Sequence, residues 1–382
     1  MTQGSEGDRF FLSALTQPDN VILSVKDLRV VFKTYRGEVK ALNRVNLELY
    51  KGEVLSLVGE SGCGKSVTAL TIVQLLPDNA DTLGGQIMLF KEDLLKKSRE
   101  QIRIVRAKEI AVVFQDPMTF LNPVLTVRTQ LEETFTFDTK ALKQAIVTQK
   151  TQGKNPKDIT YLDFLSLKEQ SSAKPSDIKA SRSEVRQVVK TLCVDVLRIV
   201  KLGDPERILH QYPFELSGGM RQRVMIAMAL ARRPAFFIAD EITTALDVTV
   251  QAQILHLLRE LRDTIGSTTL MITHDLAVAA EIADRIAVMY GGHVVEFAQT
   301  GEIFKQPLHP YTQLLMRAIP DVTQAVDSLE TIPGTVPDMI NPPPGCPFHP
   351  RCPYAMVQCL KQFPETTQFQ QNHGVACYLY GG

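Results

Sequence analysis

Eight consecutive residues match the phosphate-binding pattern G-x-x-x-x-G-K-[ST]: Gly59, Glu60, Ser61, Gly62, Cys63, Gly64, Lys65 and Ser66. Glycines let a backbone fold around a phosphate, so that successive N–H groups and the N-terminus of the following helix point at the anion. In such a loop Lys65 would contact the β- and γ-phosphates of a nucleotide, and the Ser66 hydroxyl would bind Mg²⁺. The alternative is an ordinary glycine-rich turn before a helix, which needs no Lys-Ser pair.

Two strand ends carry side chains that could act on a phosphate. The apolar run 235–239 is typical of a buried parallel strand, and it ends on Asp240 and Glu241. Because α/β sheets bind ligands at that end, Asp240 can hold Mg²⁺ and Glu241 can polarise an attacking water molecule. The strand 270–273 delivers His274 at a comparable edge. The alternatives are that Asp240 and Glu241 are solvated acids at a strand end and that His274 has a structural role.

Two further segments could contribute to the same kind of site. The strand 108–114 ends on Gln115, whose amide can reach Mg²⁺ or an attacking water. Ser217 is a candidate N-cap, and with Gly218 and Gly219 it forms a second anion-binding surface that has no lysine of its own. A capped helix after a glycine turn is common. This segment therefore indicates a nucleotide site only in combination with the phosphate loop and the side chains at the strand ends.

The elements around the phosphate loop predict an α/β core. The runs 22–32 and 39–50 show the alternation of half-buried antiparallel strands. Tyr35, in the turn between them, could stack on an adenine ring or be an ordinary exposed turn residue. The run 54–58 predicts a buried strand before the loop, and the run 67–76 predicts an apolar helix after it.

The middle of the chain differs in character from this core. Residues 124–215 lack β alternation and predict a helical subdomain, in which the polar stretch 137–183 is expected to be a solvated or partly ordered insertion. Further along, a hairpin is expected at 286–297, where Gly291 and Gly292 suit a tight turn, and a short helix at 310–319.

Composition excludes several classes of protein. The chain has 382 residues with 42 basic and 42 acidic side chains, so no global basic field favours nucleic acid as the main partner. No run reaches the roughly 18 apolar residues of a spanning helix. The N-terminus lacks the features of a signal peptide, so we expect a cytosolic protein whose six cysteines are not paired as disulfides.

Taken in order, these motifs resemble those of an ABC transporter ATPase over about residues 21–300. The resemblance rests on the phosphate loop, Gln115, the segment Leu216-Ser-Gly-Gly-Met-Arg-Gln222, the carboxylates, the segment Ala245-Leu-Asp247 and His274. The stretches 114–123 and 243–249 resemble the oligopeptide/dipeptide (and nickel) importer branch of that family. The implied fold is a P-loop NTPase core with an antiparallel β subdomain and an inserted helical subdomain.

The resemblance implies a role for each nucleotide-site residue. Tyr35 would stack on adenine, and the Walker A loop 59–66, followed by Val67, would bind ATP. Asp240 would be the Walker B carboxylate that holds Mg²⁺ together with Ser66. Gln115 would be the Q-loop residue, a further Mg²⁺ ligand that faces the membrane subunits.

The same resemblance implies a dimeric hydrolytic unit. Glu241 would be the catalytic base and His274 the switch histidine. Ser217, Gly218 and Gly219 would contact the γ-phosphate of ATP bound to the opposite ATPase subunit, and Asp247 would lie in the D-loop at that interface. Since the chain has one ATPase core, we expect a second ABC ATPase chain, in a heterodimer.

Three features depart from the family pattern. Ile242 replaces the proline that usually follows the catalytic base, and Phe120 stands where the branch often has a small polar residue. The segment 137–183 is longer than expected for the helical subdomain. None of the three removes a catalytic group, so a competent site is expected.

The implied activity is ATP hydrolysis that drives uptake of peptides at the cytoplasmic face of the cell membrane. The expected partners are two transmembrane permease subunits and, through them, an extracytoplasmic solute-binding protein. The alternatives are a nickel or other small-solute importer and, from a different class, a soluble ABC protein of translation or DNA repair. The last usually has tandem cores or a long coiled coil, and 137–183 lacks apolar heptads.

The C-terminal segment carries a cysteine cluster, with the spacing C-x₅-C-x₆-C-x₁₇-C: Cys346, Cys352, Cys359 and Cys377. The proline-rich stretch 341–353 resembles the C-terminal extension of the peptide-importer branch, in which such cysteines can hold an iron–sulfur cluster. We hypothesise a [4Fe–4S] cluster on all four. A zinc site, with His349 or His373 as a substitute ligand, and a set of reduced thiols are the alternatives.

The sequence thus predicts three parts. Residues 1–20 would be an N-terminal extension, 21–298 the ATPase domain with its helical subdomain at about 116–225, and 299–382 a C-terminal extension with the four cysteines.

Overall fold

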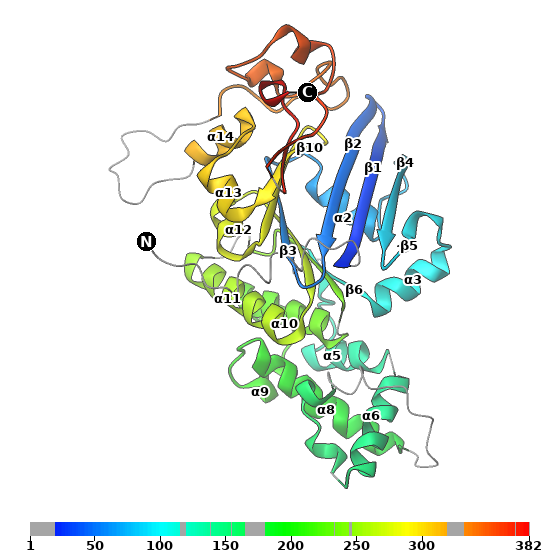
Figure 1. Cartoon of the computed structure of the whole chain (residues 1–382). Coiled ribbons are helices and arrows are strands. Elements are labelled where there is room, and N and C mark those ends of the chain that lie inside the picture. The colour runs from blue at the N-terminus through cyan, green and yellow to red at the C-terminus, as the bar shows by residue number, and fades with distance from the viewer. Residues whose placement is uncertain are drawn as a thin grey trace. The chain divides into compact units, whose positions relative to one another are not determined.

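The computed structural model describes residues 20–114, 120–137, 139–153, 155–164, 180–232, 234–243, 247–318, 332–370 and 372–381. The chain divides into two compact units (Figure 1). The first contains Met1–Arg106, Phe236–Glu241 and Gly266–Gly382, and the second contains Ala107–Ala235 and Ile242–Ile265.

The first unit begins with an antiparallel sheet in the order β2-β1-β4-β5. Its strands are β1 (Val21–Thr34), β2 (Gly37–Tyr50), β4 (Ala80–Leu89) and β5 (Glu92–Asp93). The predicted alternation is confirmed, because Val45, Leu47 and Leu49 on β2 are buried while Asn46 and Glu48 between them are exposed. One face of this sheet therefore packs in the core.

The second sheet of this unit contains the strands that carry the site. In spatial order they are β11 (Thr367–Gln370), β12 (His373–Val375), β10 (His293–Gln299), β9 (Arg285–Tyr290), β3 (Val54–Val58), β8 (Thr268–Thr273) and β7 (Phe236–Asp240). The four strands from β9 to β7 are parallel, and β3, β7 and β8 are buried along their length. Their carboxyl ends therefore meet at one edge.

Helices of the first unit follow these strands. They are α2 (Lys65–Ile72), η2 (Leu94–Lys96), α12 (Leu276–Ile282), α13 (Thr300–Lys305) and α14 (Pro310–Arg317), and α3 (Arg99–Lys108) begins there. The predicted helix after the phosphate loop is shorter than expected, because Gln74 adopts a left-handed conformation at φ 50° and ends it. The expected hairpin and the short helix α14 are confirmed.

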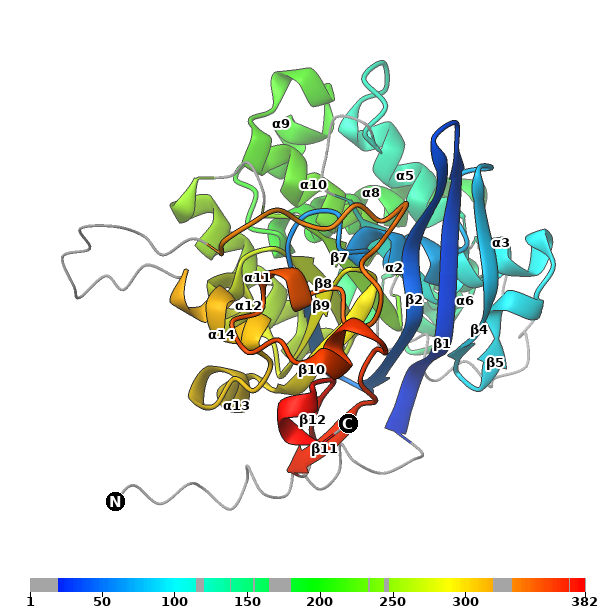
Figure 2. The same ribbon diagram turned by 90° about the horizontal axis from the view of Figure 1, so that it is seen from above.

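The C-terminal tail of this unit, described over residues 332–370 and 372–381, has little regular structure. It contains the short turns η5 (His349–Arg351), η6 (Val357–Leu360) and η7 (Tyr378–Tyr380). Its strand β12 pairs with β10, where Glu296 lies opposite Val375, so the tail extends the sheet of the core. Figure 2 shows β10, β12 and β11 following one another at this edge.

The second unit is mostly helical, as predicted. After β6 (Ile110–Val113) come α5 (Val127–Thr136), α6 (Thr139–Thr151), η3 (Pro156–Asp158), α8 (Arg182–Ile199), α9 (Pro205–Leu209), η4 (Pro213–Glu215), α10 (Gly218–Ala231) and α11 (Val248–Ile265). Side-chain caps begin several of these helices; at α8, for example, Ser181 and Glu184 form a capping box.

Part of the polar stretch 137–183 belongs to the core of this unit. In α6 the side chains of Leu142, Ala145 and Ile146 are buried, and Tyr161 is also buried and donates its hydroxyl proton to the Leu230 carbonyl at 2.5 Å. Residues 139–153 and 155–164 are therefore more ordered than the composition suggests, since a narrow apolar stripe is enough to pack a helix. Residues 165–179 lie outside the described ranges.

Candidate nucleotide site

The phosphate loop lies between β3 and α2, where the sequence predicts it. Gly64 has φ 110°, and a Cβ there would lie 2.8 Å from the Ala41 carbonyl oxygen. A Cβ on Gly59 would lie 2.2 Å from the Met289 carbonyl oxygen, so neither glycine tolerates a side chain. Lys65 is buried, and its Nζ donates to the carbonyl oxygens of Gly59, at 2.7 Å, and Glu60, at 3.0 Å.

Ser66 and Asp240 are brought together by the register of the parallel strands. Asp240 lies opposite Ile272 of β8, which lies opposite Leu57 of β3, so the end of β7 is level with the start of the loop. The Ser66 hydroxyl donates to Asp240 Oδ1 at 3.1 Å. Burial raises the pKa of Asp240 to about 6, and the neighbouring charge of Glu241 adds to the shift. Two oxygen ligands at this position suit a hard cation such as Mg²⁺.

Glu241 and His274 lie next to one another at the same sheet edge. Glu241 Oε1 is 3.4 Å from His274 Nδ1, and the exposed fractions of the two side chains are 13% and 50%. Glu241 has φ 48°, and its N–H donates to the Ile272 carbonyl oxygen at 2.9 Å. Such a backbone conformation is strained for a residue other than glycine, and strain of this kind is common at functional sites.

In the second unit, Ser217 is the N-cap that the sequence predicts. Its hydroxyl accepts a hydrogen bond from the N–H of Met220 at 3.3 Å, and both Ser217 and Gly218 are exposed. A Cβ on Gly219 would lie 2.7 Å from Val250 Cγ1, so this glycine permits α11 to approach α10. Asp247 is exposed and accepts from the N–H of Val250 at 2.9 Å.

The structure describes some of the remaining predicted residues and not others. Tyr35 is 99% exposed in the turn between β1 and β2. Ile242 is buried, and Phe120 stacks on Phe114 with ring centroids 4.6 Å apart. Gln115 lies outside the described residues, as do positions 245 and 246.

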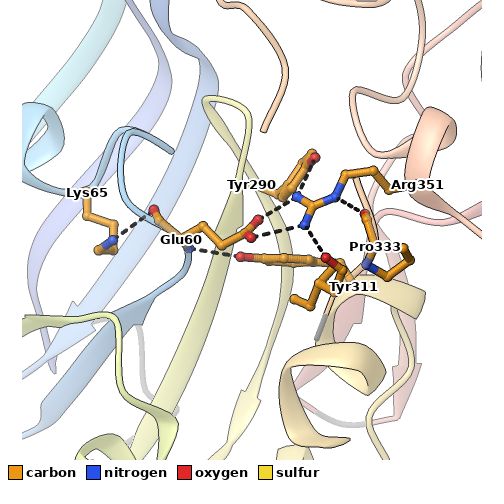
Figure 3. A network of polar contacts seen from close by, with 7 residues as sticks. Glu60, Lys65, Tyr290, Tyr311, Pro333 and Arg351 are labelled. Atoms are coloured by element: carbon orange, nitrogen blue, oxygen red, sulfur yellow. Dashed lines mark hydrogen bonds and ion pairs between the residues drawn. The ribbon is translucent and has the colours of Figure 1, made fainter. Parts of the chain in front are cut away.

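One group of contacts at the loop was missed in the sequence. The Glu60 carboxylate accepts two hydrogen bonds from Arg351 of the tail, and the Glu60 N–H donates to the Tyr311 hydroxyl at 2.9 Å (Figure 3). Arg351 and Glu60 are separated by 291 positions, and nothing in either local sequence indicates the pair.

Two protein families match this chain. Residues 42–244 match the ABC transporter family, and residues 295–359 match the oligopeptide/dipeptide transporter C-terminal region. The chain is a member of the ABC transporter ATPase family. It hydrolyses ATP in an ABC ATPase cassette fold, and the resemblance noted in the sequence is confirmed.

Similar proteins agree with this assignment. The chain is 43% identical to a dipeptide transport ATP-binding protein, DppD, of Bacillus subtilis over 359 residues, 94% of each chain. It is 41% identical to the oligopeptide transport ATP-binding protein OppD of the same species over 360 residues, 94% of this chain and 88% of OppD. Among solved structures, a dimeric structure of MJ0796, a bacterial ABC transporter cassette, matches with a TM-score of 0.52 at 26% identity, covering 73% of this chain and 98% of that chain.

No helix among the described residues combines the length and apolar character needed to cross a bilayer. Within those residues there is also no group of three or more His, Cys, Asp or Glu side chains arranged to hold a single metal ion.

All four tail cysteines nevertheless line one small cavity, of about 20 Å³. Burial raises the pKa of the Cys346 thiol to about 12 and that of Cys377 to about 11, and the neighbouring cysteines add to both shifts. His349 also lines the cavity, whereas His373 contacts Glu296 with Nε2 and Oε1 2.8 Å apart. Cys63 and Cys193 are buried elsewhere in the fold.

Proposed function

We propose that this chain energises the uptake of oligopeptides or dipeptides through a membrane permease, on whose cytoplasmic face it sits. The observation that carries the proposal is the order of the two matches, an ABC transporter ATPase followed by an oligopeptide/dipeptide transporter C-terminal region. The relatives named for dipeptide and oligopeptide transport support it, because their identity extends over 94% of this chain.

In this proposal the phosphate loop binds the β- and γ-phosphates of ATP. The N-terminus of α2, which begins at Lys65, offers its backbone N–H groups to the anion, and Lys65 adds a positive charge. Tyr35, exposed in its turn, stacks on the adenine ring. Ser66 and Asp240 hold Mg²⁺, with Gln115 as a further ligand, and the ion neutralises charge on the phosphates.

Glu241 is proposed as the group that takes a proton from the attacking water. It lies one position beyond Asp240, and its carboxylate is close enough to His274 for the imidazole to orient it. His274 is half exposed, so it can change partners during turnover while Glu241 remains near the phosphate. We expect His274 to act as the switch that senses the γ-phosphate.

The complete site is proposed to need a second ATPase subunit. Ser217 and Gly218 are exposed in a motif that has no lysine of its own, which suits contact with the γ-phosphate of ATP on a partner chain. Asp247 is also exposed and is proposed to lie in the D-loop at the same interface. With Gly219 they complete the partner's site, in a heterodimer of two ATPase chains. Two permease subunits and a solute-binding protein complete the transporter.

We further propose that Cys346, Cys352, Cys359 and Cys377 hold a [4Fe–4S] cluster. The support is that all four line one cavity. No group of three or more His, Cys, Asp or Glu side chains among the described residues is arranged for a metal ion, so the support for a cluster is the shared cavity and the cysteine spacing. Zinc is the competing occupant.

Affinity purification from a detergent extract tests the transport proposal. We expect polytopic permease subunits and a second ABC ATPase to copurify with the tagged chain. Recovery of ribosomes or DNA ends without any polytopic membrane protein would contradict it.

Anaerobic purification with iron and acid-labile sulfide assays tests the cluster separately. We expect about four irons and four sulfides per chain. A colourless protein with one zinc and no sulfide would show that zinc occupies the cavity.

A further inference from the structure

The phosphate loop is held from outside by a residue of the C-terminal tail. The two terminal nitrogens of Arg351 donate to the two oxygens of Glu60 at 2.7 and 3.1 Å, a bidentate pair. Only 5% of the Arg351 side chain and 25% of the Glu60 side chain are exposed. Charge-assisted bonds of this geometry are stronger than neutral ones, and burial reduces competition from water. The contact therefore restrains the Glu60 side chain at the loop.

Arg351 is itself held in place by groups other than Glu60. Its Nε donates to the Pro333 carbonyl oxygen at 2.8 Å, and one terminal nitrogen donates to the Tyr290 hydroxyl at 3.2 Å (Figure 3). The guanidinium also lies over the rings of Tyr290 and Phe348, 5.8 and 6.0 Å from their centroids. Its orientation is thus set before it meets the carboxylate.

Glu60 connects this arginine to the lysine of the loop. Its carbonyl oxygen accepts from Lys65 Nζ, while its N–H donates to the Tyr311 hydroxyl. Glu60 therefore joins the contact with the tail to a peptide group that accepts from Lys65. The Glu60 carboxylate also brings a negative charge into a loop that binds a polyanion, so an unpaired carboxylate would repel the phosphates.

We propose that Arg351 is a positioning residue for ATP binding, which neutralises Glu60 and so makes the affinity for ATP depend on the tail. Arg351 lies in η5 directly before Cys352, and the Cys346 carbonyl accepts from the N–H of His349 in the same turn. Whatever orders this turn therefore also orders Arg351. The proposal goes beyond the transport function and does not require the cysteines to hold a metal.

A double-mutant cycle on the full chain tests whether Arg351 affects ATP binding by neutralising Glu60. In the wild type, Arg351→Gln should raise KM for ATP about fivefold or more, while kcat changes less than about twofold. In a Glu60→Gln background the same substitution should change KM by less than about twofold, because no charge remains to be neutralised. An equal rise of KM in both backgrounds, or no rise in either, would overturn the proposal.

Arg351→Lys keeps the charge and provides a milder variant. We expect a smaller rise of KM than in Arg351→Gln, because lysine cannot form the bidentate pair. The matched control is Arg285→Lys, since Arg285 is also largely buried and contacts both oxygens of a buried Glu53, at 3.0 and 3.4 Å. Glu53 precedes β3, whereas the loop follows it, so KM should not change in the control. A similar rise of KM in both variants would assign the effect to general destabilisation.

Amide hydrogen exchange gives a second measurement. A purely structural role of Arg351 would not make the protection of the tail depend on bound nucleotide. Because coupling between two sites is reciprocal, a non-hydrolysable ATP analogue with Mg²⁺ should increase amide protection at 346–352 in the wild type. The increase should disappear in Arg351→Gln. The same increase in both proteins would contradict the proposal.

Discussion

The phosphate loop and the C-terminal tail are built in opposite ways. The loop is eight contiguous residues that follow a buried strand and run into a helix, and the spacing of its glycines identifies it in the sequence. In its described residues the tail has only short turns and a small strand pair, and it is held by distant contacts such as Arg351 with Glu60 and His373 with Glu296. A site encoded locally can be recognised in one chain, whereas a segment held by distant contacts depends on each of them.

The largest effect is expected inside the locally encoded site. Glu241→Gln should lower kcat by at least about 100-fold while ATP binding is kept, because the carboxylate acts on the attacking water. Lys65→Ala should abolish turnover, since Lys65 contacts phosphate in the ground and transition states alike. Steady-state ATPase assays and nucleotide-binding titrations measure both, with Glu365→Gln, an exposed tail residue, as the control. Turnover like that of the wild type in either variant would mean that the site is misplaced.

The next effect concerns an anchor of the tail. Glu296 is fully buried and accepts hydrogen bonds from the N–H groups of Leu308 and His309 as well as contacting His373. Glu296→Ala should lower the free energy of unfolding by about 3–5 kcal/mol, because it leaves these groups buried without their partner. Thermal or denaturant unfolding measures the loss. Asp81→Ala, which removes the exposed contact to Lys33, should have little effect; equal losses would show that burial does not distinguish the two pairs.

A smaller effect, of about tenfold, is expected from pH. The pKa of Asp240 is raised to about 6 by burial, so the ionised form that binds Mg²⁺ is lost as the pH falls through that value. One pH unit lower, roughly a tenth of the carboxylate remains ionised, and the apparent affinity for Mg²⁺ should fall accordingly. Metal titrations of ATPase activity at pH 7.5 and pH 5 measure this. An affinity that is unchanged between these pH values would contradict the assignment of Asp240.

The smallest effect is expected at the tail cysteines. Cys352→Ser should remove bound iron but change kcat at saturating ATP by less than about twofold, because the cysteines line a cavity apart from Lys65 and Glu241. Iron analysis and ATPase assays on the same protein preparation measure both quantities. Loss of turnover on substitution would give the cavity a direct part in hydrolysis.

The sequence predicts much of the fold and of the nucleotide site, because both depend on short-range patterns. Strand alternation, the glycines of the loop and the Ser217 cap each act within a few residues. The Arg351–Glu60 pair could not be predicted, since it joins positions 291 residues apart and most arginine and glutamate residues in proteins are exposed and unpaired with such distant partners. The packing of α6 was underestimated because its apolar stripe is diluted by polar residues.

Reconstituted transport tests the central claim most directly. The chain would be assembled with its permease subunits, its second ATPase and its binding protein in vesicles, and uptake of labelled peptide measured together with ATP consumption. We expect peptide uptake that requires ATP and stops in Glu241→Gln, even though that variant still binds ATP. Peptide uptake that continues at the wild-type rate in Glu241→Gln would contradict the account.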